Sequence, residues 1–414
     1  MNNTFQNRIN KLQKKIENNQ SILLSSSSDI AYYTNFNFLL PEEREAFFYI
    51  TKNSASLIYT SFSPIGNYPF LSYLKGSYPN QLANHIEKII DKEKIKEILI
   101  DPETLFVAEL NAIQDKVSGE AKDGVPEHKF KDIKINNYDA SLIQNFRNIK
   151  EPMEIDQIKK ACVITALVIE EIKNELFEGI TEHETKIKID RLLEKHGAED
   201  LAFPTIIAFG SNSALPHHQP SDKKLENNMA VLIDMGTKAA GYCSDMTRTF
   251  WFGKNPSEKF QEVETIVRDA YQAAFDRLNN RFTINEAANG GSANEKPASN
   301  EEKNETMKAE KTTVAITATT NVVPITKAKD LDNAARTYIS NKGYAEKFTH
   351  TTGHGLGLTI HEQPSISWSN VTEIYPNMTI TIEPGIYLEG EFGYRFENTV
   401  LVTEDGAIEL TLKD

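Results

Sequence analysis

Cysteine is scarce in this chain, which has only Cys162 and Cys243 among its 414 residues. Two thiols so far apart in sequence do not form the dense disulfide framework of small secreted domains. No apolar run is long enough to cross a bilayer, and the N-terminal segment lacks the continuous apolar core of a signal peptide. We therefore expect a cytoplasmic protein with reduced cysteines and no membrane partner.

Positive charge is also in deficit. The chain has 45 Lys and Arg residues against 59 Asp and Glu residues, and its formal net charge is -14. Such a charge is repelled by the phosphates of nucleic acids and anionic lipids. The composition therefore predicts a diffusing protein that does not bind nucleic acid.

The N-terminal part has the pattern of a small α/β domain. Phe5, Ile9, Leu12 and Ile16 fall on one face of a helix. After them, short β-like runs alternate with helix-like segments, as in α/β architectures. The β-like runs are residues 21–26, 46–51, 54–60 and 97–101, and the helix-like segments are residues 80–91 and 103–114. We predict a first domain over residues 1–149.

A second domain is predicted over residues 150–414, and it begins with a long helix. Pro152 suits the first turn of this helix, and Gly179 suits its end. One apolar face runs between them, formed by Ile155, Ile158, Cys162, Ala166, Ile169, Ile172 and Leu176. Capping patterns at residues 181–184 and 255–258 open two further helices, so helices interleave with antiparallel strands here.

Residues 285–311 contain no Ile, Leu, Val, Phe, Tyr or Trp, and Met307 is their only large apolar side chain. Burial cannot offset the entropy cost of ordering such a segment. We predict a disordered surface insertion that leaves the rest of the domain unaffected.

Two aspartates stand in the two arms of a predicted β-hairpin. Residues 231–253 form two β-like runs around a short turn, with Asp234 in the first run and Asp245 in the second. A turn centred on Ala239 and Ala240 places the aspartates directly opposite each other. Carboxylates at that spacing repel each other unless a cation lies between them.

A second pair of carboxylates repeats this arrangement nearer the C-terminus. Glu383 and Glu397 are symmetric about Gly390, each within an alternating β-like run, and Arg395 shares the face of Glu397. Two such pairs on adjacent strands form an oxygen-rich cluster of the kind that Mn²⁺, Co²⁺ or Zn²⁺ neutralises. The carboxylates therefore predict a metal site.

Five of the nine histidines lie in two short segments. His217 and His218 stand in a proline-bounded loop, and His350 and His361 flank His354, which lies among glycines that permit close backbone approach. Imidazole suits the same metals. A single buried aspartate or histidine is usually structural, but mirrored carboxylate pairs together with clustered histidines favour a metal centre.

Six motifs resemble those of the Xaa-Pro peptidases, the family of aminopeptidase P and prolidase. They are PHH at 216–218, IDMG at 233–236, GYCSDMTRTF at 241–250, TGHGLGLTIHE at 352–362, IEPGIY at 382–387 and RFEN at 395–398. The resemblance implies an α+β chain with a pita-bread catalytic domain and a smaller, creatinase-like α/β domain before it. Because this family often associates, we also expect a homodimer.

The same resemblance implies two divalent metal ions, with Mn²⁺ expected and Co²⁺ or Zn²⁺ as alternatives. By this likeness, Asp234 and Asp245 bind one ion. His354 and Glu383 bind the second together with Asp245, and Glu397 bridges both.

The resemblance also implies roles in catalysis. Glu383 is expected to act as the base for a metal-activated water that attacks the scissile carbonyl. His217 and His361 are expected to stabilise the tetrahedral intermediate. His350 and Arg395 are expected to contact the substrate.

The substrates implied are short peptides with proline at the second position, whose tertiary amide lacks an N–H. Many dipeptide-specific prolidases carry an arginine just after the HE-x-P turn, where it can pair with the free carboxylate, but here Ser365 follows Pro364. This favours aminopeptidase P-like cleavage of longer peptides, with an Xaa-Pro dipeptidase as the alternative. A non-catalytic pita-bread binding module is the alternative from another class, and it requires that the ligands do not converge.

Overall fold

The computed structural model describes residues 2–38, 44–60, 65–78, 80–117, 133–139, 141–279 and 323–411. The chain forms two compact units, Met1–Arg147 and Asn148–Asp414. The insertion predicted at residues 285–311 lies outside the described residues. Within the described ranges, no helix combines the length and the apolar character that a membrane span requires.

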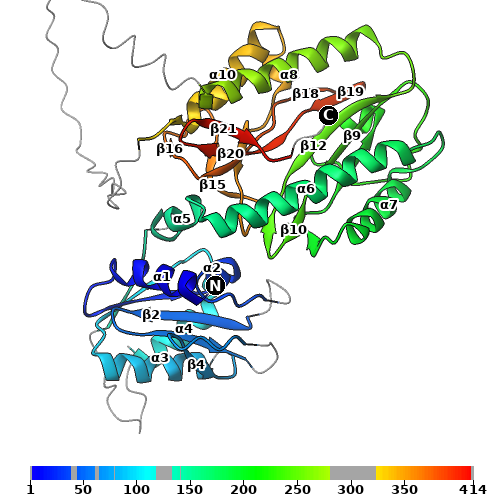
Figure 1. The fold of residues 1–414 in the computed structure, drawn as a ribbon. Coiled ribbons are helices and arrows are strands. Elements are labelled where there is room, and N and C mark those ends of the chain that lie inside the picture. Colours follow the sequence, from blue (N-terminus) through cyan, green and yellow to red (C-terminus); the bar gives the residue numbers. More distant parts are fainter. Residues whose placement is uncertain are drawn as a thin grey trace, which may run out of the picture. The chain divides into compact units, whose positions relative to one another are not determined.

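The first unit is a six-stranded mixed sheet with helices packed against it (Figure 1). Its strands are β1 (Gln20–Leu24), β2 (Ala46–Thr51), β3 (Ala55–Tyr59), β4 (Ser72–Lys75), β5 (Glu97–Ile100) and β6 (Lys134–Asn137). Its helices are α1 (Asn2–Gln13), α2 (Ser27–Thr34), α3 (Asn80–Glu93), α4 (Val107–Val117) and α5 (Ser141–Asn148). The order is β4-β3-β2-β1-β5-β6, in which β2 is antiparallel to its two neighbours and the other pairs are parallel.

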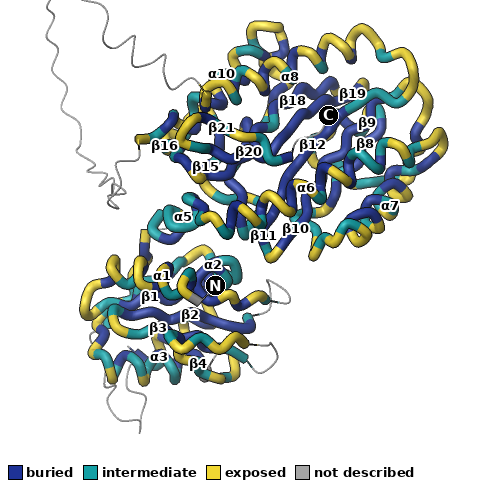
Figure 2. The backbone as a smooth tube through the Cα atoms, viewed as in Figure 1, coloured by how far each residue is buried: buried dark blue, intermediate teal, exposed yellow. Residues whose placement is uncertain are grey.

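Apolar periodicity accounts for most of this unit. The predicted stripe of α1 is buried, with Phe5, Ile9, Leu12 and Ile16 each at most 3% exposed. The β-like runs coincide with β1, β2, β3 and β5, and Figure 2 shows β1, β2 and β3 as mostly buried. The strands β4 and β6 have the sequences SYLK and KINN, which lack the apolar content that marks a buried strand.

The second unit contains four described helices, two 3₁₀ turns and fifteen short strands. The helices and turns are α6 (Pro152–Glu175), α7 (Glu182–Lys195), η1 (Gly210–Ala214), α8 (Glu258–Asn279), α10 (Ala328–Asn341) and η2 (Ala345–Lys347). The first strands are β7 (Asp200–Leu201), β8 (Ile206–Phe209), β9 (Met229–Met235), β10 (Thr237–Ala239), β11 (Tyr242–Cys243), β12 (Met246–Phe252) and β13 (Thr326–Lys327). The later strands are β14 (Gly353–Gly355), β15 (Glu362–Ile366), β16 (Glu373–Ile374), β17 (Thr379–Ile382), β18 (Gly385–Leu388), β19 (Phe392–Arg395), β20 (Asn398–Thr403) and β21 (Gly406–Glu409).

The strands of this unit lie between two pairs of helices (Figure 1). Helices α6 and α7 share an apolar core with β8, β9 and the start of β12, whereas α8 and α10 share another with β17, β18, β19 and β20. The strand pairs described in this unit are antiparallel, as the sequence predicts. The middle layer therefore comes from two halves of the unit, each backed by its own helices.

The helices α6, α7 and α8 begin at the predicted signals, but α6 ends at Glu175, before the predicted stop at Gly179, and Leu176 lies outside it. The apolar stripe of α6 is buried from Ile155 to Ile172. In the capping box of α7, Thr181 and Glu184 exchange hydrogen bonds. Helix α8 begins inside the predicted range, and Ser257 caps it by accepting a hydrogen bond from the N–H of Phe260 at 3.1 Å.

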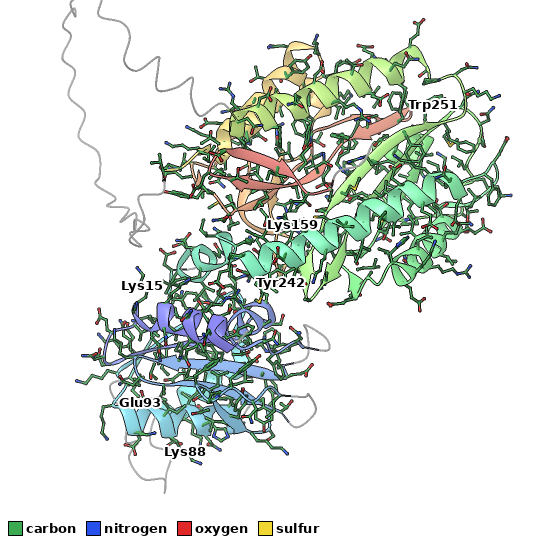
Figure 3. The ribbon with its side chains drawn as sticks, viewed as in Figure 1. Lys15, Lys88, Glu93, Lys159, Tyr242 and Trp251 are labelled. Atoms are coloured by element: carbon green, nitrogen blue, oxygen red, sulfur yellow. The ribbon has the colours of Figure 1, made fainter. Side chains whose placement is uncertain are left out.

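The β10–β11 hairpin packs beneath α6. Tyr242, labelled in Figure 3, lies under this helix and is 6% exposed. Its hydroxyl donates to Glu154 Oε1 of α6 at 3.0 Å. This contact anchors the hairpin that carries the chain from Asp234 to Asp245.

Candidate metal centre

Asp234 and Asp245 belong to the two arms of one hairpin, but they are not directly opposite each other. Strand β9 pairs with β12 in a register that sets Asp234 against Thr247. Asp245 immediately precedes β12. The predicted direct pairing of the two aspartates is therefore wrong.

The turn of this hairpin explains the difference. Ala239 pairs with Tyr242, so Ala240 and Gly241 form a two-residue turn, with φ of 48° and 80°. Two successive positive φ angles are typical of the type I′ turn that suits strand twist. The predicted centre, Ala239 and Ala240, is off by one residue. The pairing shifts by two residues as a result, which leaves Asp245 on the same face because side chains alternate.

The two glutamates keep the predicted symmetry about Gly390. Strands β18 and β19 pair in a register that sets Gly385 against Arg395, and β17 pairs with β20 about the same centre. Glu383 and Glu397 do not lie within strands, however. Each occupies the break where the chain passes between the five-stranded and the two-stranded sheet. This break frees both side chains from the alternation of a regular ladder.

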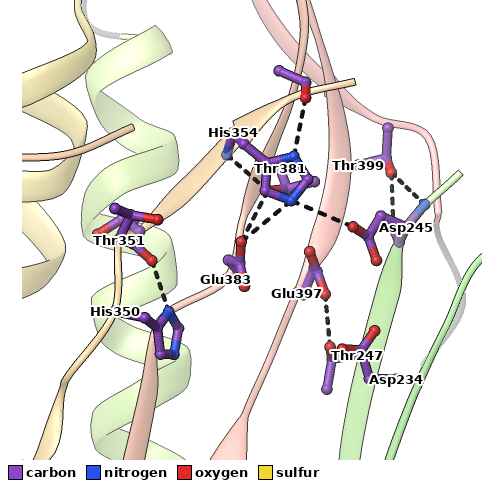
Figure 4. Close-up of polar contacts among 12 residues, drawn as sticks. Asp234, Asp245, Thr247, His350, Thr351, His354, Thr381, Glu383, Glu397 and Thr399 are labelled. Atoms are coloured by element: carbon purple, nitrogen blue, oxygen red, sulfur yellow. Dashed lines mark hydrogen bonds and ion pairs between the residues drawn. The ribbon is translucent and has the colours of Figure 1, made fainter. Parts of the chain in front are cut away.

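The carboxylates converge with His354 on one point of the middle layer (Figure 4). Ligand atoms of Asp245, His354 and Glu397 all lie within 4.8 Å of one another. His354 Nε2 is 3.5 Å from Asp245 Oδ2 and 3.6 Å from Glu383 Oε1. Four of the five residues predicted as ligands therefore meet directly.

Asp234 joins this group through Arg395 and Thr247. The Arg395 guanidinium donates to Asp234 Oδ2 at 2.6 Å and to Thr247 Oγ1 at 3.1 Å. Thr247 donates in turn to Glu397 Oε2 at 2.6 Å. The second oxygens, Asp234 Oδ1 and Glu397 Oε1, are buried and have no hydrogen-bond partner among the described residues. Such atoms are costly unless a cation contacts them.

The donor set fits a metal. His354 Nδ1 faces the carbonyl of Gly355 at 3.0 Å and donates to it, so Nε2 is the ring nitrogen that faces the carboxylates. A metal ion between these groups would be bound by the Nε2 lone pair of a neutral ring and by the carboxylate oxygens. The same cation would satisfy the unpartnered oxygens of Asp234 and Glu397. Imidazole and carboxylate together suit Mn²⁺, Co²⁺ or Zn²⁺.

The pKa values of the clustered carboxylates also favour a bound cation. Burial raises the pKa of Asp245 well above its ordinary value, and the charges of Asp234 and Glu383 raise it further. Burial, followed by the charge of Asp245, does the same to the pKa of Glu397. Arg395 opposes these shifts, but a single guanidinium does not neutralise the cluster. A bound dication would reverse them and keep the carboxylates ionised.

Glycines bring the backbone of His354 close to its neighbours. A Cβ atom on Gly353 would lie 2.1 Å from the carbonyl oxygen of Thr381, and one on Gly355 would lie 2.3 Å from that of Gln363. Both distances are impossible for a side chain. The predicted close backbone approach around His354 is confirmed.

His217 and His361 are exposed, unlike the acidic floor of the site. The His361 ring meets the His354 ring edge-on, with centroids 4.5 Å apart. Burial of its inner part lowers the pKa of His361, and the charges of His354 and His217 lower it further. The three imidazoles are therefore close enough to influence one another.

His350 lies on a hydrogen-bonded chain that leads to the cluster. Arg395 donates to the Tyr387 hydroxyl at 2.9 Å, and this hydroxyl lies 2.8 Å from His350 Nε2. Burial lowers the pKa of His350, and its Nδ1 faces the Thr351 carbonyl at 2.8 Å. Arg395 is 3% exposed and is held inside the protein by Asp234 as well. A substrate contact by Arg395 stays a prediction.

Sequence reasoning missed the residues that support this site. Thr247 and Tyr387 stand inside recognised motifs, but no spacing identifies their partners across the sheet. Glu362, beside His361, is bound by the buried Lys150 at 3.1 Å, and these two residues are 212 positions apart. Only the folded chain brings such pairs together.

Comparisons with known proteins show the family of this chain. The chain belongs to metallopeptidase family M24, whose sequence model matches residues 156–290 and 297–404. An uncharacterized peptidase of Staphylococcus aureus (strain bovine RF122 / ET3-1) is 30% identical over 406 residues, which are 98% of each chain.

Solved structures are similar over the whole chain. An Xaa-Pro dipeptidase from Bacillus anthracis matches with a TM-score of 0.77 and 26% identity, covering 99% of this chain and 98% of that one. An X-Pro aminopeptidase from Thermotoga maritima MSB8 matches with a TM-score of 0.73 and 28% identity, covering 98% of each. The predicted pita-bread fold with an N-terminal α/β domain is confirmed.

Proposed function

We propose that this protein is a dinuclear-metal exopeptidase that cleaves the N-terminal Xaa-Pro bond of short peptides, as aminopeptidase P does. The observation that carries the proposal is the pair of unpartnered oxygens, Asp234 Oδ1 and Glu397 Oε1, beside the convergent Asp245, His354 and Glu383. Similarity along the full chain to an Xaa-Pro dipeptidase and an X-Pro aminopeptidase supports it.

Asp234, Asp245, His354, Glu383 and Glu397 would hold the two ions. When bound, the ions would supply Lewis acidity toward the scissile carbonyl and a nucleophile at neutral pH. Thr247 and Arg395 keep their carboxylate partners in place through the hydrogen bonds described above. The ligand set is therefore preorganised by buried neighbours before any ion binds.

Glu383 would carry the proton of the attacking water. It is only partly buried, and Thr381 Oγ1 lies 3.3 Å from its Oε1. A carboxylate in this position can take a proton and return it to the departing proline nitrogen. The exposed imidazoles of His217 and His361 would donate hydrogen bonds to the oxyanion, and His350 would contact the substrate.

An Xaa-Pro dipeptidase is the alternative reaction. The solved structure from Bacillus anthracis carries that description. Against it stands Ser365, which occupies the position where an arginine could pair with the free carboxylate of a dipeptide. A binding module without catalysis is less favoured, because it requires ligands that do not converge, whereas four of the five candidate ligands lie together.

The test is hydrolysis of Arg-Pro-Pro and of Gly-Pro by the purified, Mn²⁺-loaded protein. We expect release of arginine from the tripeptide, loss of this activity with chelator, and little cleavage of Gly-Pro. Glu383→Gln should lower kcat by about a hundredfold or more because it removes the base. Glu391→Gln is the matched control, since Glu391 is exposed on the same hairpin.

The other outcomes separate the alternatives. Cleavage of Gly-Pro alone would identify a dipeptidase despite Ser365. Failure to cleave either peptide in the presence of Mn²⁺ would overturn the enzymatic proposal and favour the binding module.

A further inference from the structure

Glu182 is a buried carboxylate outside the metal cluster, in the first turn of α7, and its side chain is 0% exposed. Its Oε1 accepts hydrogen bonds from the N–H of Phe209 at 2.7 Å and from Asn212 Nδ2 at 2.9 Å. Its Oε2 accepts from the N–H of Ser221 at 2.9 Å and from Ser221 Oγ at 2.5 Å, and it lies 2.8 Å from His218 Nε2. Five donors, one at the end of β8 and four in the segment that follows it, therefore surround this carboxylate.

The charge on Glu182 determines how His218 binds. Burial alone would raise the pKa of Glu182, but hydrogen bonds from Ser221, His218 and the Phe209 N–H outweigh it and lower the pKa. An ionised carboxylate only accepts, so His218 Nε2 must donate. The contact sets the orientation of the imidazole, whose Nε2 also lies 3.2 Å from Asn212 Nδ2.

This contact lies one residue from His217. On the other side of His217, the Pro216 carbonyl accepts from Arg395 Nη1 at 3.4 Å. The backbone N–H of His218 also donates to the carbonyl of Leu215 at 3.1 Å. The residues on both sides of His217 are thus held, whereas the His217 side chain itself is exposed.

A second attachment holds the start of the loop. The N–H of Gly393 in β19 donates to Ser213 Oγ at 2.8 Å. A Cβ atom on Gly393 would lie 2.0 Å from the carbonyl oxygen of Ser213, so the loop lies directly against this strand. The loop is therefore tied to β19 at one end and to α7 through Glu182 at the other.

We propose that Glu182 and His218 are positioning residues for His217: their charged hydrogen bond fixes the loop of residues 213–221 and so sets where the His217 imidazole stands over the metal cluster. This inference rests on the proposed function, which assigns His217 to the oxyanion. Arg395 serves both sites, because it contacts Pro216 in the loop and Asp234 in the cluster. Neither Glu182 nor His218 contacts the substrate in this scheme.

The experiment compares three substitutions in the full-length protein. His218→Met removes the donor at similar side-chain length, and His218→Gln retains an N–H donor near the position of Nε2. His196→Met is the control, because His196, at the other end of α7, makes a more exposed Nε2 contact of the same length, 2.8 Å, with Glu171 of α6. Each variant is measured for amide hydrogen exchange of residues 213–221 without metal, for Mn²⁺ stoichiometry, and for kcat and KM on Arg-Pro-Pro.

We expect His218→Met to speed amide exchange in the loop and to lower kcat by about tenfold or more, since small misplacements of a catalytic group are costly. KM and Mn²⁺ stoichiometry should stay near the wild-type values, because the oxyanion contact forms only in the transition state. His218→Gln should restore most of the loss, and His196→Met should change none of these quantities.

Three results would overturn the inference. The first is that His218→Met exchanges its loop amides and turns over substrate at wild-type rates. The second is that His218→Gln loses as much kcat as His218→Met. The third is that His218→Met binds less Mn²⁺ than the wild type. Failure of the proposed function would give a different result, because the wild type itself would then cleave neither peptide. The amide exchange data would still show whether the hydrogen bond between Glu182 and His218 holds the loop.

Discussion

Two kinds of buried carboxylate can be distinguished residue by residue. Glu182 is surrounded by donors and leaves no oxygen unsatisfied. Asp234 and Glu397 are also buried, yet each has one oxygen with a partner and one without, within the described residues. Asp190 Oδ1 also has no hydrogen-bond partner among the described residues, so a half-satisfied carboxylate indicates a ligand site only where, as here, it lies beside other ligand-type side chains. This difference separates Glu182 from Asp234 and Glu397.

The pH dependence of stability follows for Glu182. Its pKa in the folded chain lies below the ordinary value of 4.5, so its contribution to stability is complete above about pH 4.5 and is lost as pH falls through the folded pKa. Glu182→Gln should lower the free energy of unfolding at pH 7 by about 2 kcal/mol, because an amide cannot accept all five bonds. The deficit should shrink below pH 4.5.

Urea denaturation of wild type and variant at stepwise lower pH measures this. Glu194→Gln, an exposed change on the same helix, is the control and should match the wild type throughout. If the difference in unfolding free energy between wild type and Glu182→Gln stayed constant down to the acid transition, the charge of Glu182 would not contribute to stability.

At the scale of the elements, the turn between β10 and β11 sets the register in which β9, which contains Asp234, pairs with β12, which follows Asp245. Ala240 has a φ of 48°, a left-handed conformation that costs an alanine about 1 kcal/mol. The N–H groups of Ala240 and Gly241 donate to Glu199 at 2.7 and 3.1 Å, which helps hold the turn. The pairing of β9 with β12 follows from this turn.

Ala240→Asn should therefore stabilise the protein by about 0.5 to 1 kcal/mol, since asparagine followed by glycine is the preferred type I′ pair. Gly241→Ala should destabilise by a similar amount, because the added Cβ meets only Leu358 at 3.8 Å and strain is the main cost. Thermal denaturation of both variants tests the pair. Changes of the same sign would show that turn strain does not govern this hairpin.

At the scale of the whole molecule, the insertion predicted at residues 285–311 gives a test by deletion. Its flanks are well anchored, because α8 and α10 pack in one apolar core and β13 pairs with β16. Deleting residues 287–311 should leave the melting temperature and Arg-Pro-Pro hydrolysis nearly unchanged, since the segment has almost no apolar side chains to bury.

A longer deletion is the control for this test. Extending it through Lys327 removes β13 and the buried Ile325, and should lower the melting temperature. A large loss from the shorter deletion would mean that the segment packs against the unit or gates the site. The expected homodimer remains a separate prediction, to be measured by light scattering.

The sequence by itself determined the elements whose signals are local. The buried stripes of α1 and α6, the capping box of α7 and the symmetry of the last hairpins about Gly390 are all encoded by residues a few positions apart. Periodicity and turn chemistry act over that range. The five candidate ligands were recognisable for the same reason, because mirrored hairpins and a glycine-flanked histidine are local patterns.

Tertiary structure decided the rest. Asp234 and Arg395 are 161 positions apart, and the register that brings Asp234 opposite Thr247 depends on left-handed angles at Ala240 and Gly241 that no alternation of side chains specifies. The attachment of the His217 loop to Glu182 likewise needs the packed helix. Contacts between distant segments depend on how whole elements pack, and that information lies in the folded chain rather than in any short stretch of it.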